Sequence, residues 1–150
     1  MKRFLFSNSP AELIQSLALL TLRVGTGLMM LLGHGWTKFQ SFDKMKESFP
    51  IPKIWILESW MNHTTSLAAT IFAEVVCSFL IIIGLATRPA AAVLAFTMSI
   101  AAFVVLRDAP YVKKELALFY LLAAVVLLIS GAGRYAIDSR FWQEKKRMFR

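Results

Sequence analysis

The feature that most constrains this chain is an apolar stretch, residues 13–32, that carries an arginine near its middle. The hydrocarbon core of a bilayer is about 30 Å thick, and a helix needs roughly 20 apolar residues to cross it. This stretch is long enough to do so. An arginine at that depth is costly unless a neighbouring helix or a water-filled cavity receives it. Arg23 therefore requires a polar partner elsewhere in the fold.

The best candidate for that partner is Glu74, the only acidic residue well inside another apolar stretch. It lies near the middle of residues 65–85. If the two stretches cross the membrane antiparallel, we expect Arg23 and Glu74 to meet at similar depth as a buried ion pair. Two interpretations stay open. The pair either fixes the register of the two helices, or it binds a polar headgroup or a proton.

Composition places the whole chain in the membrane class. Its 150 residues are 57% hydrophobic, above the roughly 45–50% of soluble domains, and the mean hydropathy is +0.60. Apolar segments joined by short turns predict an all-α, polytopic membrane protein that forms one domain over residues 1–150, an antiparallel bundle of four transmembrane helices. The predicted spans are about residues 11–34, 65–85, 90–106 and 115–131.

The long connection between the first two spans, residues 40–63, contains aromatic and aliphatic residues together with Pro50 and Pro52. The prolines prevent one helix from running through it. We expect a short amphipathic helix over residues 53–61 that lies in the interface or caps the bundle. An ordinary membrane-anchored loop and a functional lid are both compatible with this pattern. The C-terminal residues 139–150 are predicted to form a basic amphipathic tail.

The net charge of +8 does not indicate nucleic-acid binding, because the basic residues lie at the chain ends and in loops. There they can meet anionic lipid headgroups. With four spans, the side of both termini carries nine Lys or Arg and the opposite side seven. The positive-inside rule thus slightly favours cytoplasmic termini in a bacterial inner membrane.

The sequence offers little for metal or thiol chemistry. Cys77 is the only cysteine, so an internal disulfide and a dithiol redox motif are excluded. The two histidines, His34 and His63, lack a suitably spaced carboxylate or thiol, and no metal site is predicted.

A second candidate cluster consists of His34, Lys38 and Glu115. The first two residues close the first span and Glu115 opens the fourth, so an antiparallel bundle puts all three at one interface. Histidine titrates near neutral pH and could exchange a proton with water or a ligand there. The alternative is a set of snorkelling anchors joined by a surface salt bridge.

Several motifs in fixed order resemble the DoxX family of small four-helix membrane proteins. They are RVGTGLMMLLGHGWTKF, then FPIPK in the loop, then AEVVCSFLIIIGLATRPAA, and finally KKELALFYLLAAVVLLISGAGRYAID. The resemblance covers about residues 23–138 and implies that the family's shared polar positions are Arg23, His34, Lys38, Glu74, Glu115 and Asp138. It assigns none of them a catalytic role. Some relatives carry a histidine near the end of the third span, where this chain has Val104, Val105 and Leu106.

The resemblance also implies an association with quinone-linked membrane redox systems. Our leading hypothesis is a quinone-associated subunit of such a system, with a polar headgroup bound near Arg23 and Glu74. No flavin, haem, iron–sulfur or dinucleotide motif is present, so electrons would come from a partner protein or a bound quinone. Whether the chain itself is an enzyme stays open. A non-catalytic assembly subunit and an oligomeric carrier of protons or small molecules are the alternatives.

Overall fold

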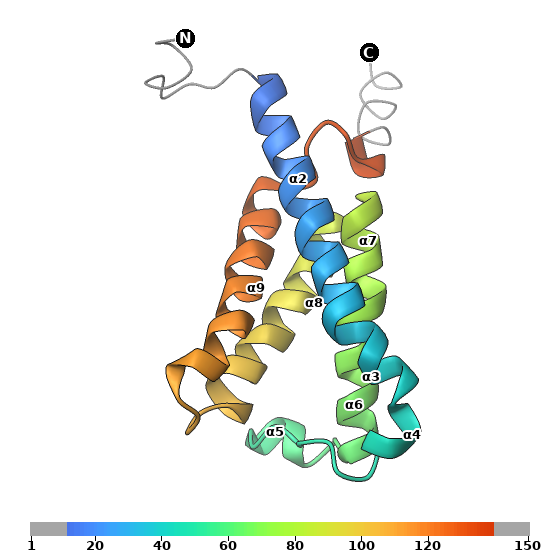
Figure 1. The fold of residues 1–150 in the computed structure, drawn as a ribbon, viewed down its shortest axis with the longest axis vertical. Coiled ribbons are helices and arrows are strands. Elements are labelled where there is room, and N and C mark those ends of the chain that lie inside the picture. The colour runs from blue at the N-terminus through green and yellow to red at the C-terminus, as the bar shows by residue number, and fades with distance from the viewer. Residues whose placement is uncertain (1–11, 140–150) are drawn as a thin grey trace.

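The computed structural model describes residues 12–139, which form helices and no strand. The predicted first residue of the first span, residue 11, lies outside the described residues, as do residues 140–150 of the basic tail predicted over residues 139–150. The described chain runs back and forth along one long axis, and its two ends lie at the same end of the molecule (Figure 1). We call this the terminal end and the opposite one the loop end.

The first rod comprises α2 (Glu12–Met30), η1 (Leu31–Gly35) and α3 (Trp36–Gln40), which follow one another without a break. It is longer than the predicted span over residues 11–34. His34 and Lys38 were expected to lie at an interface, and the helix continues through both residues. Gly33 and Gly35 lie within this rod and do not end it, which agrees with the frequent occurrence of glycine in membrane helices.

The second rod comprises α6 (His63–Ile71), η2 (Phe72–Cys77) and α7 (Ser78–Ile83). It begins with a capping box, in which the Thr65 backbone N–H donates to Asn62 Oδ1 at 2.8 Å and the Asn62 N–H donates to Thr65 Oγ1 at 2.8 Å. It ends at Gly84, whose φ of +73° lies in the left-handed region that glycine adopts without strain.

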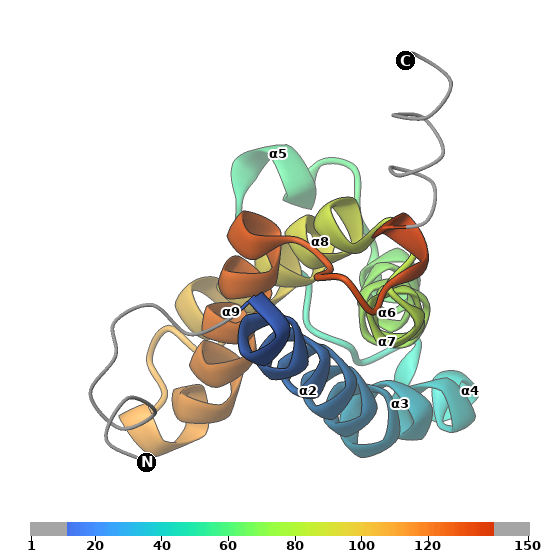
Figure 2. The same ribbon diagram turned by 90° about the horizontal axis from the view of Figure 1, so that it is seen from above.

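The remaining rods are α8 (Thr87–Ile100) with η3 (Ala101–Val105), and α9 (Tyr111–Ser130). In Figures 1 and 2, α8 lies beside α9 and α2 lies beside α7, and the contacts agree. Small residues on α8 and α9 permit close approach, as in other membrane helix pairs. The buried core between the rods includes Met30, Cys77, Ile81, Ala91, Leu94, Met98, Ala124 and Leu127.

Three of the rods contain a π-helical turn, namely η1, η2 and η3. A π turn inserts an extra residue into the helix and is frequent at functional sites. η1 contacts η2, and η2 contacts α8, which η3 continues. Nothing in the sequence indicated these turns, since hydropathy patterns do not distinguish a π turn from an α turn.

The connection over residues 41–62 folds across the loop end, where Figure 1 shows α5 (Trp55–Glu58) lying below the rods. Before it comes the short helix α4 (Phe42–Met45). The predicted amphipathic helix over residues 53–61 is thus present as the single turn α5. Ser66 Oγ donates to the Pro50 carbonyl at 2.8 Å, which ties this connection to α6.

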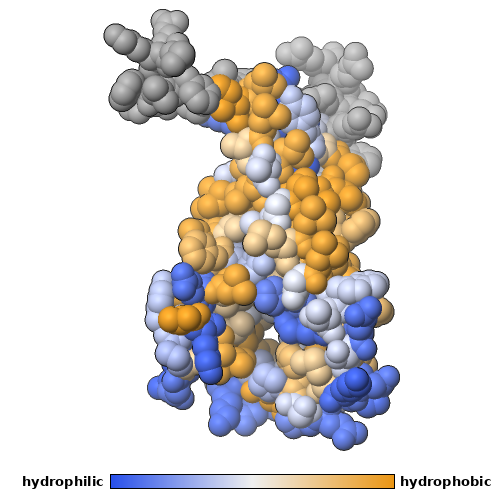
Figure 3. Space-filling model, in the orientation of Figure 1, coloured by the Kyte–Doolittle hydropathy of each residue, from blue (hydrophilic) through white to orange (hydrophobic). Residues whose placement is uncertain are grey.

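Three of the helical segments are long and apolar enough to cross a membrane: Leu13–Gln40, His63–Ile83 and Thr87–Val105. Helix α9 is of similar length but carries Lys113, Lys114 and Glu115 near its start. Figure 3 shows hydrophobic residues covering most of the upper and middle surface, whereas the loop end is mainly hydrophilic. Large apolar side chains of the rods, such as Phe79, Phe96 and Phe119, are exposed, as expected for contact with lipid.

Candidate functional site

The predicted ion pair between Arg23 and Glu74 is not formed. Both side chains are buried, at 1% and 3% exposure, but each bonds to a different partner. Arg23 donates to two backbone carbonyls, whereas Glu74 forms an ion pair with Lys38. The expectation that these residues share a site is therefore wrong.

The register of the first two rods explains the error. A Cβ added to Gly35 would lie 2.8 Å from the Glu74 carbonyl oxygen, so these two positions face each other. A Cβ added to Gly84 would contact the Arg23 guanidinium, so this glycine faces Arg23. Because a helix rises 1.5 Å per residue, Arg23 and Gly35 are about 18 Å apart along the rod. The two charges belong to opposite ends of the bundle.

Arg23 holds the segment that follows α9. Its Nη1 donates to the Ala132 carbonyl at 2.8 Å and its Nη2 to the Tyr135 carbonyl at 2.7 Å. Asp138, three residues further on, accepts from the backbone N–H groups of Ala86 and Thr87 at 2.8 and 2.9 Å. Together these bonds fasten the chain after α9 across the terminal end of the bundle, which is a structural role.

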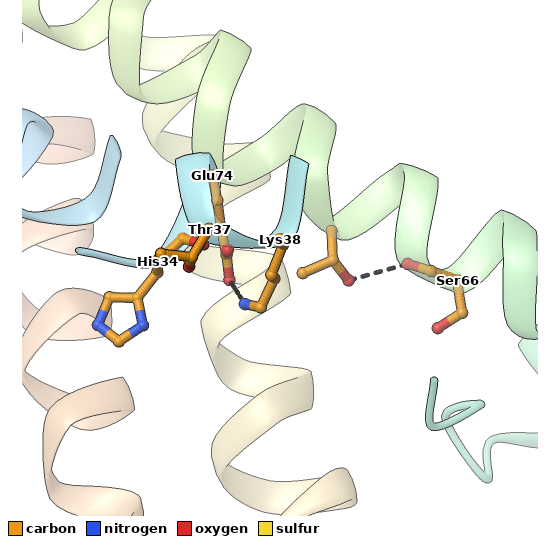
Figure 4. A network of polar contacts seen from close by, with 6 residues as sticks. His34, Thr37, Lys38, Ser66 and Glu74 are labelled. Carbon is orange, nitrogen blue, oxygen red and sulfur yellow. Dashed lines mark hydrogen bonds and ion pairs between the residues drawn. The ribbon is translucent and has the colours of Figure 1, made fainter. Parts of the chain in front are cut away.

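The buried acid of the second rod has its partner at the loop end. Lys38 Nζ from α3 contacts Glu74 Oε1 from η2, as Figure 4 shows. Glu74 is 3% exposed, whereas the Lys38 side chain is 23% exposed. The second carboxylate oxygen, Glu74 Oε2, is buried and has no hydrogen-bond partner among the described residues. Glu74 Oε2 can therefore still accept a hydrogen bond from a ligand.

The expected cluster of His34, Lys38 and Glu115 is only partly assembled. Figure 4 shows His34 near the ion pair with its ring turned away from it. That ring meets the Tyr120 ring of α9 edge to face, with centroids 5.6 Å apart. Glu115 is exposed, and within residues 12–139 it forms no ion pair. Lys38 therefore pairs with Glu74 and not with Glu115.

A pocket of about 560 Å³ begins at this ion pair and extends between the second and third rods. Lys38 and Glu74 are the charged residues that line it. The rest of its wall is mostly apolar and comes from the loop, α5, α6, η2, α8 and η3, including Phe49, Pro50, Leu57, Ala69, Phe72, Val93, Phe96, Met98 and Ala101. Such a combination of an apolar wall and few polar groups is typical of a ligand site.

The pocket reaches the outer surface of the helical bundle, where its wall is apolar. Phe72, Val93 and Phe96 line it and are 51%, 38% and 59% exposed. Its other end is closed by the loop, whose Pro50 carbonyl accepts from Ser66 on α6. Thr70, one turn later, donates to the Ser66 carbonyl at 2.9 Å (Figure 4). The Ser66–Pro50 bond holds the loop against α6, whereas the Thr70–Ser66 bond lies within that helix.

Sequence analysis identified Lys38 and Glu74 as candidate site residues but did not predict that they form an ion pair with each other. The available signal was the spacing of small residues, since Gly27 and Gly35 mark where the second rod approaches. A Cβ at Gly27 would lie 3.1 Å from the Ser78 carbonyl oxygen. Among residues 12–139, no three His, Cys, Asp or Glu side chains come together as a metal-binding group. Cys77 is buried at 2% exposure within the apolar core.

Fold and surface together define an integral membrane protein of the all-α class, with three candidate spans and a further C-terminal helix. The DoxX family sequence profile matches residues 18–107, more than half of the chain, so the protein belongs to the DoxX family. Searches of curated proteins and of solved structures each gave no significant match.

Proposed function

We propose that this DoxX family protein binds a membrane-soluble molecule of the quinone type in the pocket at Lys38 and Glu74, as part of a membrane redox system. The observation that carries the proposal is an apolar pocket, about 560 Å³ in volume, that contains one ion pair. An apolar tail would lie along the wall. The polar headgroup would lie at Lys38 and Glu74.

The size and exposure of the pocket support such a ligand. Pockets for small molecules typically measure about 300–1,000 Å³. The exposed side chains of Phe72 and Phe96 line the outer wall, so a ligand dissolved in the bilayer could enter without crossing water. Lys38 Nζ has three N–H donors and uses one on Glu74, which leaves donors for a carbonyl or hydroxyl oxygen.

In this proposal the chain supplies the binding site and a partner protein in the membrane supplies the oxidant or reductant. The residues that the headgroup would touch are Lys38 and Glu74. Arg23, His34 and Glu115, which were candidates on sequence grounds, have no contact with the ligand in this proposal. A second copy of the chain is a further candidate partner.

We also propose that α9 crosses the membrane, which gives four crossings and puts both ends of the described chain on the same side. The larger number of Lys and Arg residues on that side favours the cytoplasm of a bacterial cell. The charged residues of α9 are confined to its start, and the helix of 20 residues measures about 30 Å at 1.5 Å per residue, the thickness of the hydrocarbon core. Lys113 and Lys114 can reach the interface by snorkelling. The pocket then lies in the outer half of the membrane.

Two adjacent alanines of α6 provide the test. Ala69 lines the pocket, whereas Ala68 is exposed outside it. Isoprenoid quinones that copurify with the protein are quantified by mass spectrometry in wild type, Ala69→Phe and Ala68→Phe. We expect Ala69→Phe to lose most of the bound quinone and Ala68→Phe to retain it. Equal quinone content in all three proteins, each correctly folded, would contradict the proposal.

A further inference from the structure

Glu74, which lines the pocket, has a buried carboxylate oxygen that accepts no hydrogen bond from residues 12–139. Lys38 contacts Glu74 Oε1, and Glu74 Oε2 is left without a partner in the described chain. The Glu74 side chain is 3% exposed, so bulk water does not solvate it freely. A buried polar atom without a partner is unfavourable, and more so when it is charged. A ligand that brings a donor would remove this cost.

We infer that the occupant of the pocket carries a hydroxyl group on an aromatic headgroup, a phenol-type amphiphile, whose O–H donates to Glu74 Oε2. The inference rests on the proposed function and narrows it to a class of ligand. The hydroxyl oxygen can accept from Lys38 Nζ at the same time. A quinone meets this requirement only in its reduced, hydroxyl-bearing form.

Other headgroups fit the ion pair less well. A carboxylate or phosphate would be repelled by Glu74, and an ammonium group would be repelled by Lys38. A neutral group that both donates and accepts complements the pair. Phe49, Phe72 and Phe96 line the same pocket, and aromatic rings pack favourably against one another. An aromatic hydroxyl therefore satisfies the polar end and the apolar wall together.

Two ligands of nearly equal shape test this inference. 4-Decylphenol has the donor, and 4-decylanisole replaces it with a methyl ether. Binding of each to the wild-type protein in nanodiscs is measured against empty nanodiscs. A hydrogen bond to a charged group contributes about 1.5–3 kcal/mol, so we expect the phenol to bind at least about tenfold more tightly. Equal affinity for both ligands would overturn the inference and leave the proposed pocket in place.

Variants distinguish the requirement for a hydroxyl group from the existence of the binding site itself. Glu74→Gln removes the buried anion, and Glu58→Gln changes an exposed carboxylate outside the pocket. We expect the preference for the phenol to shrink in Glu74→Gln and to persist in Glu58→Gln. A preference that persists in a folded Glu74→Gln would also overturn the inference. If neither ligand binds wild type, or if Ala69→Phe binds both as wild type does, the proposed function fails.

Discussion

At the scale of residues, Arg23 and Glu74 are the buried charged side chains of the described chain, and the structure gives them different tasks. Arg23 uses its guanidinium on two backbone carbonyls of the segment after α9. Glu74 pairs with Lys38 at the pocket and keeps one oxygen free of protein partners. Both buried charges need polar partners. At the terminal end these partners are backbone carbonyls that stabilise the fold, and at the loop end the partner is Lys38, in a candidate site.

Replacing only Lys38 should destabilise the protein more than replacing both Lys38 and Glu74. Lys38→Met leaves a carboxylate that is 3% exposed, whereas Glu74→Leu leaves an ammonium that is 23% exposed and can reach water. We expect Lys38→Met to lower the free energy of unfolding most, by on the order of 3 kcal/mol, and the double variant to be more stable than Lys38→Met. Unfolding in detergent titrated with SDS measures this, with Lys44→Met as the control. Additive losses in the double variant would contradict it.

Replacing Arg23 should affect the terminal end and spare the pocket. Arg23→Met removes two charge-assisted hydrogen bonds to the Ala132 and Tyr135 carbonyls, each contributing about 1.5–3 kcal/mol. We expect faster amide hydrogen exchange in residues 131–139 and unchanged ligand binding. Loss of ligand binding in a folded Arg23→Met protein would show that the residue belongs to the site.

At the scale of elements, close contact between the first two rods determines which side chains meet. The backbone of Glu74 in η2 lies against Gly35 in η1, so no side chain fits between them. This contact brings Lys38, one turn beyond Gly35, to the carboxylate. The π turns η2 and η3 contribute residues to the pocket, among them Glu74 and Ala101.

Two glycines of η1 give a matched test of that contact. A Cβ at Gly35 would lie 2.8 Å from the Glu74 carbonyl oxygen, whereas a Cβ at Gly33 would meet nothing within 4 Å. We expect Gly35→Ala to destabilise the protein and weaken ligand binding. Gly33→Ala should be neutral or stabilise by about 0.5–1 kcal/mol, because alanine favours the helix. Thermal unfolding of both variants decides the matter, and equal behaviour would contradict this register.

The sequence predicted the long helical segments but not their π turns or their register. Apolar length and the two prolines of the loop gave the helices, and Arg23 and Glu74 were recognised as buried charges. Their pairing was wrong because both lie near the middle of their apolar stretches, and hydropathy does not show how far one helix is shifted along another. Backbone approach at Gly35 and Gly84 sets that shift. The pocket was not predicted, since its wall combines side chains from a loop and three rods.

At the scale of the whole molecule, the apolar band and the polar loop end place the described chain across a bilayer (Figure 3). Three segments qualify as spans by length and composition, and α9 is the fourth in our proposal. Since α8 and α9 lie beside each other along their length, a membrane that contains one should contain the other.

Single cysteines in a Cys77→Ala background test whether α9 crosses. Ala109→Cys lies before α9 and Ala132→Cys lies after it. We expect a membrane-impermeant maleimide to label Ala109→Cys only from the outer side of the cytoplasmic membrane and Ala132→Cys only from the inner side. Labelling of both from one side would mean that α9 does not cross.

The most direct test of the pocket is photolabelling with a 4-decylphenol that carries a diazirine in its tail. We expect the label to attach to α6 and α8 and unlabelled 4-decylphenol to prevent its attachment. Ala69→Phe should lose the label, whereas Ala68→Phe should retain it. Label spread over the outer faces of α2 and α9, unaffected by the competitor, would contradict a ligand site at Lys38 and Glu74.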